Sequence, residues 1–239
     1  MIPIKDDNPT YYFPITTILL ILINIGVYVY QVTRGPEFQT FIYRLGVIPW
    51  EITHFREAPN IPLHYWSNMP NIFTLLTSMF VHGGIFHLLG NMLYLWIFGD
   101  NVEALSGHMR FLGFYLCCGL AATFIQIIIA PNSLIPMVGA SGAISGVLGA
   151  YLLHFPRAKI HVLVFFFFFI RIVRISALFV LGLWFFIQVF NGFGSLGPGE
   201  TGGVAWFAHI GGFISGMIFV FLFKKKKSVR IYRKTNWWN

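Results

Sequence analysis

Long apolar stretches constrain what this chain of 239 residues can fold into. A helix needs about 20 mainly apolar residues to cross a membrane. Six segments approach that length: 12–31, 84–103, 110–130, 137–155, 175–191 and 203–223. Only 10% of the residues are charged, whereas soluble domains carry about 25%. The sequence therefore predicts an all-α fold, a polytopic membrane bundle of six transmembrane helices that forms a single domain over 1–239.

Two apolar segments could be something other than ordinary spanning helices. The segment 160–170 contains five consecutive phenylalanines, but it is short for a span and has basic residues on both sides. We expect it to be interfacial or re-entrant on the cytoplasmic side, with a seventh span as the alternative. The first apolar segment follows a leader with one lysine and two aspartates, and no small-residue cleavage site comes after it. It is therefore predicted to be a retained helix, not a signal peptide.

The loop charges predict the orientation. Six spans place both termini on one side of the membrane, and 13 of the 16 lysines and arginines fall on that side. The other side holds only Arg34, Arg44 and Arg56. The positive-inside rule then puts residues 1–11 and the basic tail 224–239 in the cytoplasm, on either side of a core over about 12–223. This distribution explains the net charge of +8 without nucleic acid. The tail is read as an orientation anchor, with binding to anionic lipid as a weaker alternative.

The two longest outer loops differ in kind. The first, about 32–83, is too long for a bare linker, and its aromatic content predicts a folded element in the outer interface. The last, 191–203, contains six glycines, which is typical of a hinge or gate.

Polar residues inside the apolar segments are the candidates for chemistry. Such residues are expensive in a bilayer and by default indicate function. Ser141 lies in the sequence Gly-Ala-Ser-Gly, and His209 lies in Ala-His-Ile-Gly-Gly. Counting at 1.5 Å per residue from the outer loops places Ser141, His209 and Asn91 at a similar depth of about 7–10 Å. A nucleophile and a base on separate helices would therefore lie at the same depth in the membrane.

The surrounding residues support a hydrolytic site. His209 would act as general base toward Ser141 and then as general acid toward the leaving amine. His87 and Asn91, four residues apart on one helix face, could donate hydrogen bonds to an oxyanion together with the backbone amide of Ser141. We expect His82, at the mouth of the same helix, to be structural. None of the eight acidic residues falls at this depth, so the sequence predicts a Ser–His dyad without an acid.

A metal site is the rival interpretation, because His and Asn can ligate metals. No carboxylate or cysteine is expected nearby, and the spacing matches no zinc motif. We therefore predict neither a metal nor a cofactor.

Small residues predict a close crossing of two helices. Small side chains at helical spacing let backbones pack tightly in lipid, although plain packing accounts for the glycines alone. One stripe of this kind is Ala205, His209, Gly212 and Gly216, and another is Gly142, Gly146 and Ala150.

With these residues assembled, the chain resembles the rhomboid family of intramembrane serine proteases from about Phe80 to Gly216. The resemblance is carried, in order, by His82-x4-His87-x3-Asn91, Gly99-x3-Glu103, Gly139-Ala140-Ser141-Gly142, and Ala208-His209-x-Gly211-Gly212 with Gly216.

The resemblance implies Ser141 as nucleophile, His209 as its base, and His87 and Asn91 as oxyanion donors. It also implies a mobile last loop, the fifth transmembrane helix as a substrate gate, and membrane-spanning protein substrates. These substrates would be cut near the outer end of a helix, often after a small residue. The resemblance further suggests a bacterial cytoplasmic membrane, with the active site opening toward the outer side.

Two positions depart from the family pattern. Ser145 occupies the place where many members have an aromatic residue that stacks on the catalytic histidine, so Phe207 or Trp206 would have to hold the imidazole. Phe73 and Thr74 stand where many bacterial members have a Trp-Arg pair in the first loop.

Two other functions remain as alternatives to a protease. One is a catalytically silent relative that binds transmembrane helices, although such relatives usually lack the serine or the histidine. The other is a small-molecule transporter, which the sequence disfavours because it shows neither an internal repeat nor an intramembrane acid.

Overall fold

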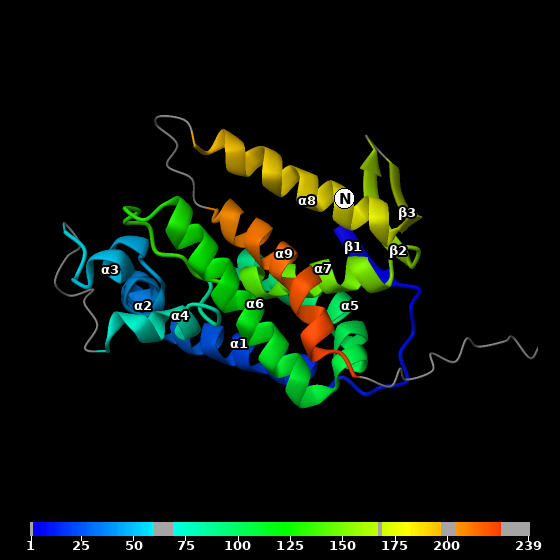
Figure 1. The fold of residues 1–239 in the computed structure, drawn as a ribbon, viewed down its shortest axis with the longest axis horizontal. Coiled ribbons are helices and arrows are strands. Elements are labelled where there is room, and N and C mark those ends of the chain that lie inside the picture. Colours follow the sequence, from blue (N-terminus) through cyan, green and yellow to red (C-terminus); the bar gives the residue numbers. More distant parts are fainter. Residues whose placement is uncertain (1, 60–68, 167–168, 197–203, 226–239) are drawn as a thin grey trace, which may run out of the picture.

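The computed structural model describes residues 2–59, 69–166, 169–196 and 204–225. They form a helical bundle with a small sheet at one end (Figure 1). Short 3₁₀ helices also occur at Gly35–Glu37 and Asn71–Phe73. In chain order, the elements are β1 (Ile2–Asp6), α1 (Ile15–Thr33), α2 (Phe38–Leu45), α3 (Pro49–His54), α4 (Thr74–Thr77), α5 (Ile85–Ser106), α6 (His108–Ile129), α7 (Ser141–His154), β2 (Lys159–Phe166), β3 (Phe169–Ser176), α8 (Ala177–Gly194) and α9 (Trp206–Phe223).

The helical membrane bundle predicted from the sequence is confirmed. Two of the six predicted spans differ from the prediction in length or hydropathy. Among the described residues, α1, α6, α8 and α9 are long and apolar enough to cross a membrane. The predicted spans 84–103 and 137–155 correspond to α5 and α7, which do not meet that criterion. Helix α5 has 22 residues, but polar residues such as His87, Asn91 and Asp100 interrupt its apolar sequence and lower its mean hydropathy. Helix α7 has 14 residues, so it extends about 21 Å, less than the bilayer core of about 30 Å.

Helix α7 is short because the chain before it is extended. Met137 forms an isolated antiparallel bridge with Val47 of the first loop, and the helix begins only at Ser141. The depth predicted for Ser141 assumed that the helix begins at residue 137, and this expectation was wrong. The extended approach instead places the serine at the first turn of its helix, where backbone N–H groups have no partner within the helix.

A three-stranded sheet was not predicted. Its order is β1-β2-β3, and both pairs are antiparallel. The described residues of the segment 160–170 lie in β2 and at the start of β3, so the alternative of a seventh spanning helix was wrong. The reason is a period of two in the sequence: Ile160, Val162 and Val164 are β-branched residues at alternate positions, a pattern that favours strands. Ile160 and Val162 are fully buried.

The sheet ties the N-terminal strand to the end of α7 that is remote from Ser141. The hydroxyl of Tyr151 on α7 donates a hydrogen bond to Asp6, and burial raises the pKa of this carboxyl group to about 6. Beside it, Asp7 lies 2.7 Å from His161 Nε2 on β2. This interaction with His161 lowers the pKa of Asp7. The N-terminal strand and the β2–β3 hairpin therefore lie at the same end of the bundle (Figure 1).

The first loop is folded in its described parts, as predicted. Its helices α2, α3 and α4 pack beside the loop between α6 and α7. The amide of Trp50 donates to the carbonyl of Ser133 at 3.1 Å, and the hydroxyl of Thr53 donates to the carbonyl of Pro131 at 2.9 Å. The aromatic residues Tyr65 and Trp66 lie outside the described residues. Placement of this loop in the outer membrane interface stays a prediction.

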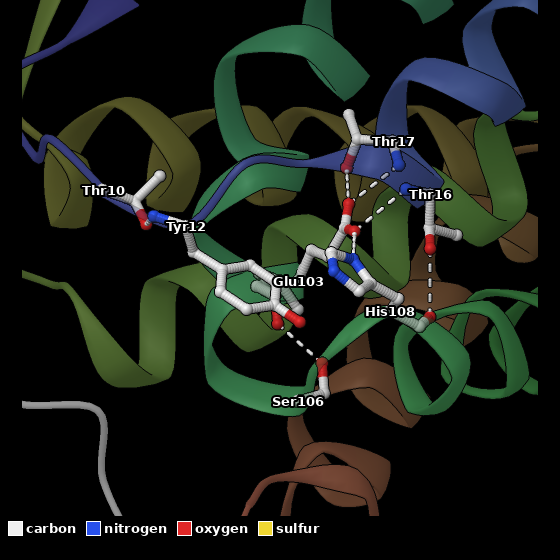
Figure 2. A network of polar contacts seen from close by, with 8 residues as sticks. Thr10, Tyr12, Thr16, Thr17, Glu103, Ser106 and His108 are labelled. Atoms are coloured by element: carbon white, nitrogen blue, oxygen red, sulfur yellow. Dashed lines mark hydrogen bonds and ion pairs between the residues drawn. The ribbon is translucent and has the colours of Figure 1, made fainter.

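A buried carboxylate from α5 caps the start of α1 (Figure 2). Glu103 is fully buried, and its two oxygens accept hydrogen bonds from the backbone amides of Thr16 and Thr17 at 2.9 and 2.8 Å. The hydroxyl of Thr17 and the ring of His108 also donate to it. Pro14 at the N-cap offers no side-chain bond, so Glu103 satisfies amides that α1 would otherwise leave unpaired. Its negative charge is also favourable at a helix N-terminus.

Helices α7 and α9 cross in close backbone contact through glycines, as predicted. A β-carbon on Gly212 would overlap the carbonyl of Gly142, and one on Gly216 would overlap the carbonyl of Gly146. One turn further along α7, a β-carbon on Gly149 would overlap the carbonyl of Phe213. The crossing therefore needs glycine for steric reasons, and it brings α9 against the helix that begins with Ser141.

Candidate functional site

Ser141 and His209 are in hydrogen-bond contact. Ser141 Oγ lies 2.8 Å from His209 Nε2, although the two residues are 68 positions apart in the sequence. Ser141 is the first residue of α7, and His209 lies in the first turn of α9. The crossing of these helices through Gly142 and Gly212 sets the separation of the two side chains. This contact is the geometry that a serine nucleophile and its general base require.

Side-chain hydrogen bonds are found at the starts of both helices, one from another helix and one from within α7. Gln126 of α6 accepts a hydrogen bond from the amide of Ala208 at 3.1 Å, and this amide also donates to the carbonyl of Ala205 at 3.1 Å. Ser145, which replaces the family's aromatic residue, is buried and donates to the carbonyl of Ser141 at 2.6 Å. Ser145 is therefore occupied within its own helix, and none of its hydrogen bonds in the described part of the chain goes to His209.

Residues of α8 and α9 surround the imidazole of His209 instead. Its Nδ1 lies 2.8 Å from Oε1 of Gln188 on α8. The ring of Trp184 lies 6.0 Å away between centroids, and that of Trp206 lies edge-on at 6.3 Å. Phe207, the other residue considered for this role, packs edge-on against Phe193.

Gln188 was missed in the sequence analysis. The available signal was a single amide within an apolar run from Ala177 to Phe190.

His87 and Asn91 of α5 lie beside Gly139, two residues before Ser141. A β-carbon on Gly139 would come within 2.8 Å of His87 Nε2 and 3.5 Å of Asn91 Nδ2. Gly139 also has φ +119°, in the region that favours glycine. Asn91 Nδ2 is buried and has no hydrogen-bond partner among the described residues. A buried donor without a partner is costly, so this nitrogen is free to donate to an acceptor beside the serine.

His82 has a different environment from His87. It is fully buried, and its ring meets that of His87 edge-on, with 5.2 Å between centroids. Gln31 of α1 donates to the backbone carbonyl of His82 at 2.9 Å. These contacts join α1 to the chain before α5.

Two hollows adjoin the site. A pocket of about 250 Å³ is lined by His87, Gln126 and Ala205, together with residues 133 and 135–138 of the loop before α7. A second hollow of about 30 Å³ lies beside Ser141, between Met79, Gly119 and Ala122. The larger pocket can admit a peptide segment, whereas the smaller has room for about one water-sized group.

Metal chemistry has no ligand set in the described part of the chain. There, no group of three or more His, Cys, Asp or Glu residues is placed to hold a metal ion. Cys117 and Cys118 are free thiols on α6. The predicted glycine-rich hinge 191–203 lies partly outside the described residues. Glu200, an acidic residue of this segment, also lies outside them.

The fold and the site together define an integral membrane protein with a serine–histidine pair inside its helical bundle. The model of the Rhomboid domain matches residues 70–226, which is more than half of the chain. The chain belongs to the rhomboid family.

Named relatives share parts of this region. The chain is 45% identical to the rhomboid protease GluP of Bacillus subtilis (strain 168) over 78 residues, or 33% of this chain and 15% of that protein. It is 36% identical to the mitochondrial presenilin-associated rhomboid-like protein A of Danio rerio over 88 residues, covering 36% and 23% of the two chains. RHOMBOID-like protein 7 of Arabidopsis thaliana is 29% identical over 189 residues, covering 79% and 50%. The alignments thus span half or less of each relative's length.

Proposed function

We propose that this protein is an intramembrane serine endopeptidase that cleaves peptide bonds in or near the transmembrane helices of other membrane proteins. The observation that carries the proposal is the 2.8 Å contact between Ser141 Oγ and His209 Nε2 at the meeting of two membrane-embedded helices. Membership of the rhomboid family, which includes a relative named as a protease, supports it.

In the proposed reaction, His209 Nε2 takes the proton of Ser141 as the hydroxyl oxygen attacks the substrate carbonyl carbon. The protonated imidazole then gives this proton to the leaving amine, and an acyl group remains on Ser141. Water attacks the ester with His209 again as base, which releases the carboxylic acid and restores the serine. No acidic residue takes part, so the catalytic pair is a dyad.

The oxyanion that forms in each step needs hydrogen-bond donors. We assign this role to the side chains of His87 and Asn91 and to the backbone amide of Ser141. The free Nδ2 of Asn91 and the position of both side chains beside Gly139 support the assignment. Donors fixed in a site that excludes water stabilise such charge strongly, because they need no reorganisation during the reaction.

The two hollows suggest how a substrate lies in the site. The pocket of about 250 Å³ beside His87 would take the unwound segment of a transmembrane helix. The hollow of about 30 Å³ next to Ser141 would take the side chain before the cleaved bond, which favours a small residue such as alanine. The substrate would enter beside α8, which corresponds to the fifth of the six predicted transmembrane segments. In this proposal α8 is the substrate gate.

We further propose that both termini face the cytoplasm and that the site opens toward the outer side of a bacterial cytoplasmic membrane. The basic residues that the structure gathers at one end support this orientation: Lys5 pairs with His161 across the sheet, and Lys225 bonds to Leu105 at the end of α5. Accessibility of single cysteines to an impermeant thiol reagent in intact cells tests it. Labelling at position 5 rather than at position 133 would contradict the orientation.

Cleavage of a reporter transmembrane helix by the purified protein in liposomes tests the function. The native protein is expected to cut the reporter, and Ser141→Ala and His209→Ala are expected to leave it intact. Cleavage by Ser141→Ala would overturn the mechanism. Binding of the reporter without cleavage by the native protein would instead support the alternative, a catalytically silent relative.

A further inference from the structure

Gln188 is a buried amide in an apolar helix. Its exposed fraction is 5%, and residues 183–187 and 189–190 beside it are aromatic or aliphatic. Placing an amide in apolar surroundings is unfavourable unless its polar atoms are hydrogen-bonded. Both polar atoms of Gln188 have partners: Nε2 lies 3.3 Å from the carbonyl of Trp184, and Oε1 lies 2.8 Å from His209 Nδ1.

These two partners fix which way the amide faces. A backbone carbonyl can only accept a hydrogen bond, so the NH₂ group of Gln188 must face Trp184. The amide oxygen therefore faces His209, and it can only accept. His209 must then carry its proton on Nδ1, which leaves the lone pair of Nε2 directed at the hydroxyl of Ser141.

We infer that Gln188 is a positioning residue for the proposed serine hydrolase reaction. It accepts the Nδ1 hydrogen of His209 and holds the imidazole in the tautomer that can take the proton of Ser141. The inference rests on the proposed function. In triads a carboxylate gives the base this orientation, and its charge also stabilises the imidazolium. An amide gives the orientation alone, without the cost of placing a charge in apolar surroundings.

The position of Gln188 also links the site to α8. This helix lies at the edge of the bundle in Figure 1 and packs chiefly against α9. It buries a single stripe of residues, Ala177, Leu181, Gln188 and Gly192. An outward movement of α8 would therefore separate Gln188 from His209. The base is held for catalysis only while α8 is docked, so admission of a substrate and activation of the serine occur in sequence.

Kinetics of variants at position 188 test the inference. Gln188→Met keeps the length of the side chain but removes the carbonyl, and Gln188→Glu keeps an acceptor. With the reporter helix, Gln188→Met is expected to lower kcat about 10- to 100-fold with KM little changed, because the base is misplaced. Gln188→Glu should recover most of this loss. Phe186→Leu, on the exposed face of the same helix, is the matched control and should keep the native kcat.

The inference is overturned if Gln188→Met keeps the native kcat, or if Gln188→Glu is no better than Gln188→Met. If native cleavage depends on Ser141 while Gln188→Met behaves like the native protein, only the inference fails. Cleavage that does not depend on Ser141 refutes the proposed function itself.

A spectroscopic readout needs no folded variant at position 188. In ¹⁵N-histidine-labelled native protein, the His209 signal, assigned by its loss in His209→Ala, should show the Nδ1-protonated tautomer. A proton on Nε2 in the native protein would contradict the inference, whatever the kinetics.

Discussion

The backbone of Gly216 on α9 lies against that of Gly146 on α7, so closely that a β-carbon on Gly216 would overlap the Gly146 carbonyl oxygen. Because that oxygen belongs to a helix backbone, it cannot move aside as a side chain could. We expect Gly216→Ala to lower the free energy of unfolding by about 1–3 kcal/mol and to separate Ser141 from His209, which lowers activity. Unfolding in detergent, followed by circular dichroism, measures the change.

The control for this substitution is Gly26→Ala on α1. A β-carbon at Gly26 would meet nothing within 4 Å, and alanine favours a helix over glycine by about 0.5–1 kcal/mol. Gly26→Ala should therefore be neutral or stabilising. Equal stability of the two alanine variants would show that close backbone packing does not hold α7 against α9.

Asn91 should affect activity without supporting the fold. Its side-chain nitrogen is buried without a partner among the described residues, so removing it relieves a cost. We expect Asn91→Ala to lower kcat about 10²- to 10³-fold, as loss of an oxyanion donor does, with an unchanged or higher midpoint of thermal unfolding. A fall in both kcat and the midpoint would instead assign Asn91 a structural role.

Glu103 should affect stability through α1. Glu103→Ala leaves the amides of Thr16 and Thr17 without their acceptor, and we expect it to cost about 1–3 kcal/mol of unfolding free energy. The matched control is Glu37→Ala, since Glu37 is exposed and pairs only with Arg34 at 3.3 Å among the ion pairs of the described residues. A surface pair of this kind contributes about 0–1 kcal/mol. Similar losses in the two variants would contradict the capping role of Glu103.

Tethering α8 to α9 should separate substrate entry from chemistry. A β-carbon on Gly192 would lie 3.4 Å from that of Trp206, close to the separation of about 3.8 Å in disulfides. In Gly192→Cys/Trp206→Cys, oxidation is expected to stop cleavage of the reporter helix and to leave labelling by a small fluorophosphonate intact. The reduced protein and the oxidised single variants are the controls. Equal cleavage by the oxidised and reduced forms would exclude α8 as the gate.

The helical bundle could be predicted because long apolar runs indicate membrane spans and because small residues recur at helical spacing. The apolar segments gave α1, α6, α8 and α9, and the spacing of Gly142, Gly146, Gly212 and Gly216 gave the crossing of α7 and α9. The sheet was missed because hydropathy counts do not distinguish a short apolar strand from a short apolar helix. The alternation of Ile160, Val162 and Val164 carried that information, whereas the pairing of β1 depends on contacts distant in sequence.

The candidate site could be predicted in part, because some of its residues are unusual for their position in the sequence. Ser141, His209, His87 and Asn91 stand out because polar residues in apolar helices are rare, and the structure brings Ser141 and His209 into contact and places the other two beside Gly139. Gln188 is equally unusual in α8, but its partner depends on the rotation of α8 relative to α9. The partner of Ser145 was also hidden, because a hydroxyl can bond to the carbonyl one turn back in its own helix.

The central claim is that His209 makes Ser141 a nucleophile, and covalent labelling tests it most directly. A fluorophosphonate phosphonylates a serine oxygen with loss of fluoride, and mass spectrometry of the digested protein locates the modified residue. We expect modification of Ser141 in the native protein and its loss in His209→Ala. An unmodified Ser141 in the native protein, or equal modification without His209, would contradict it.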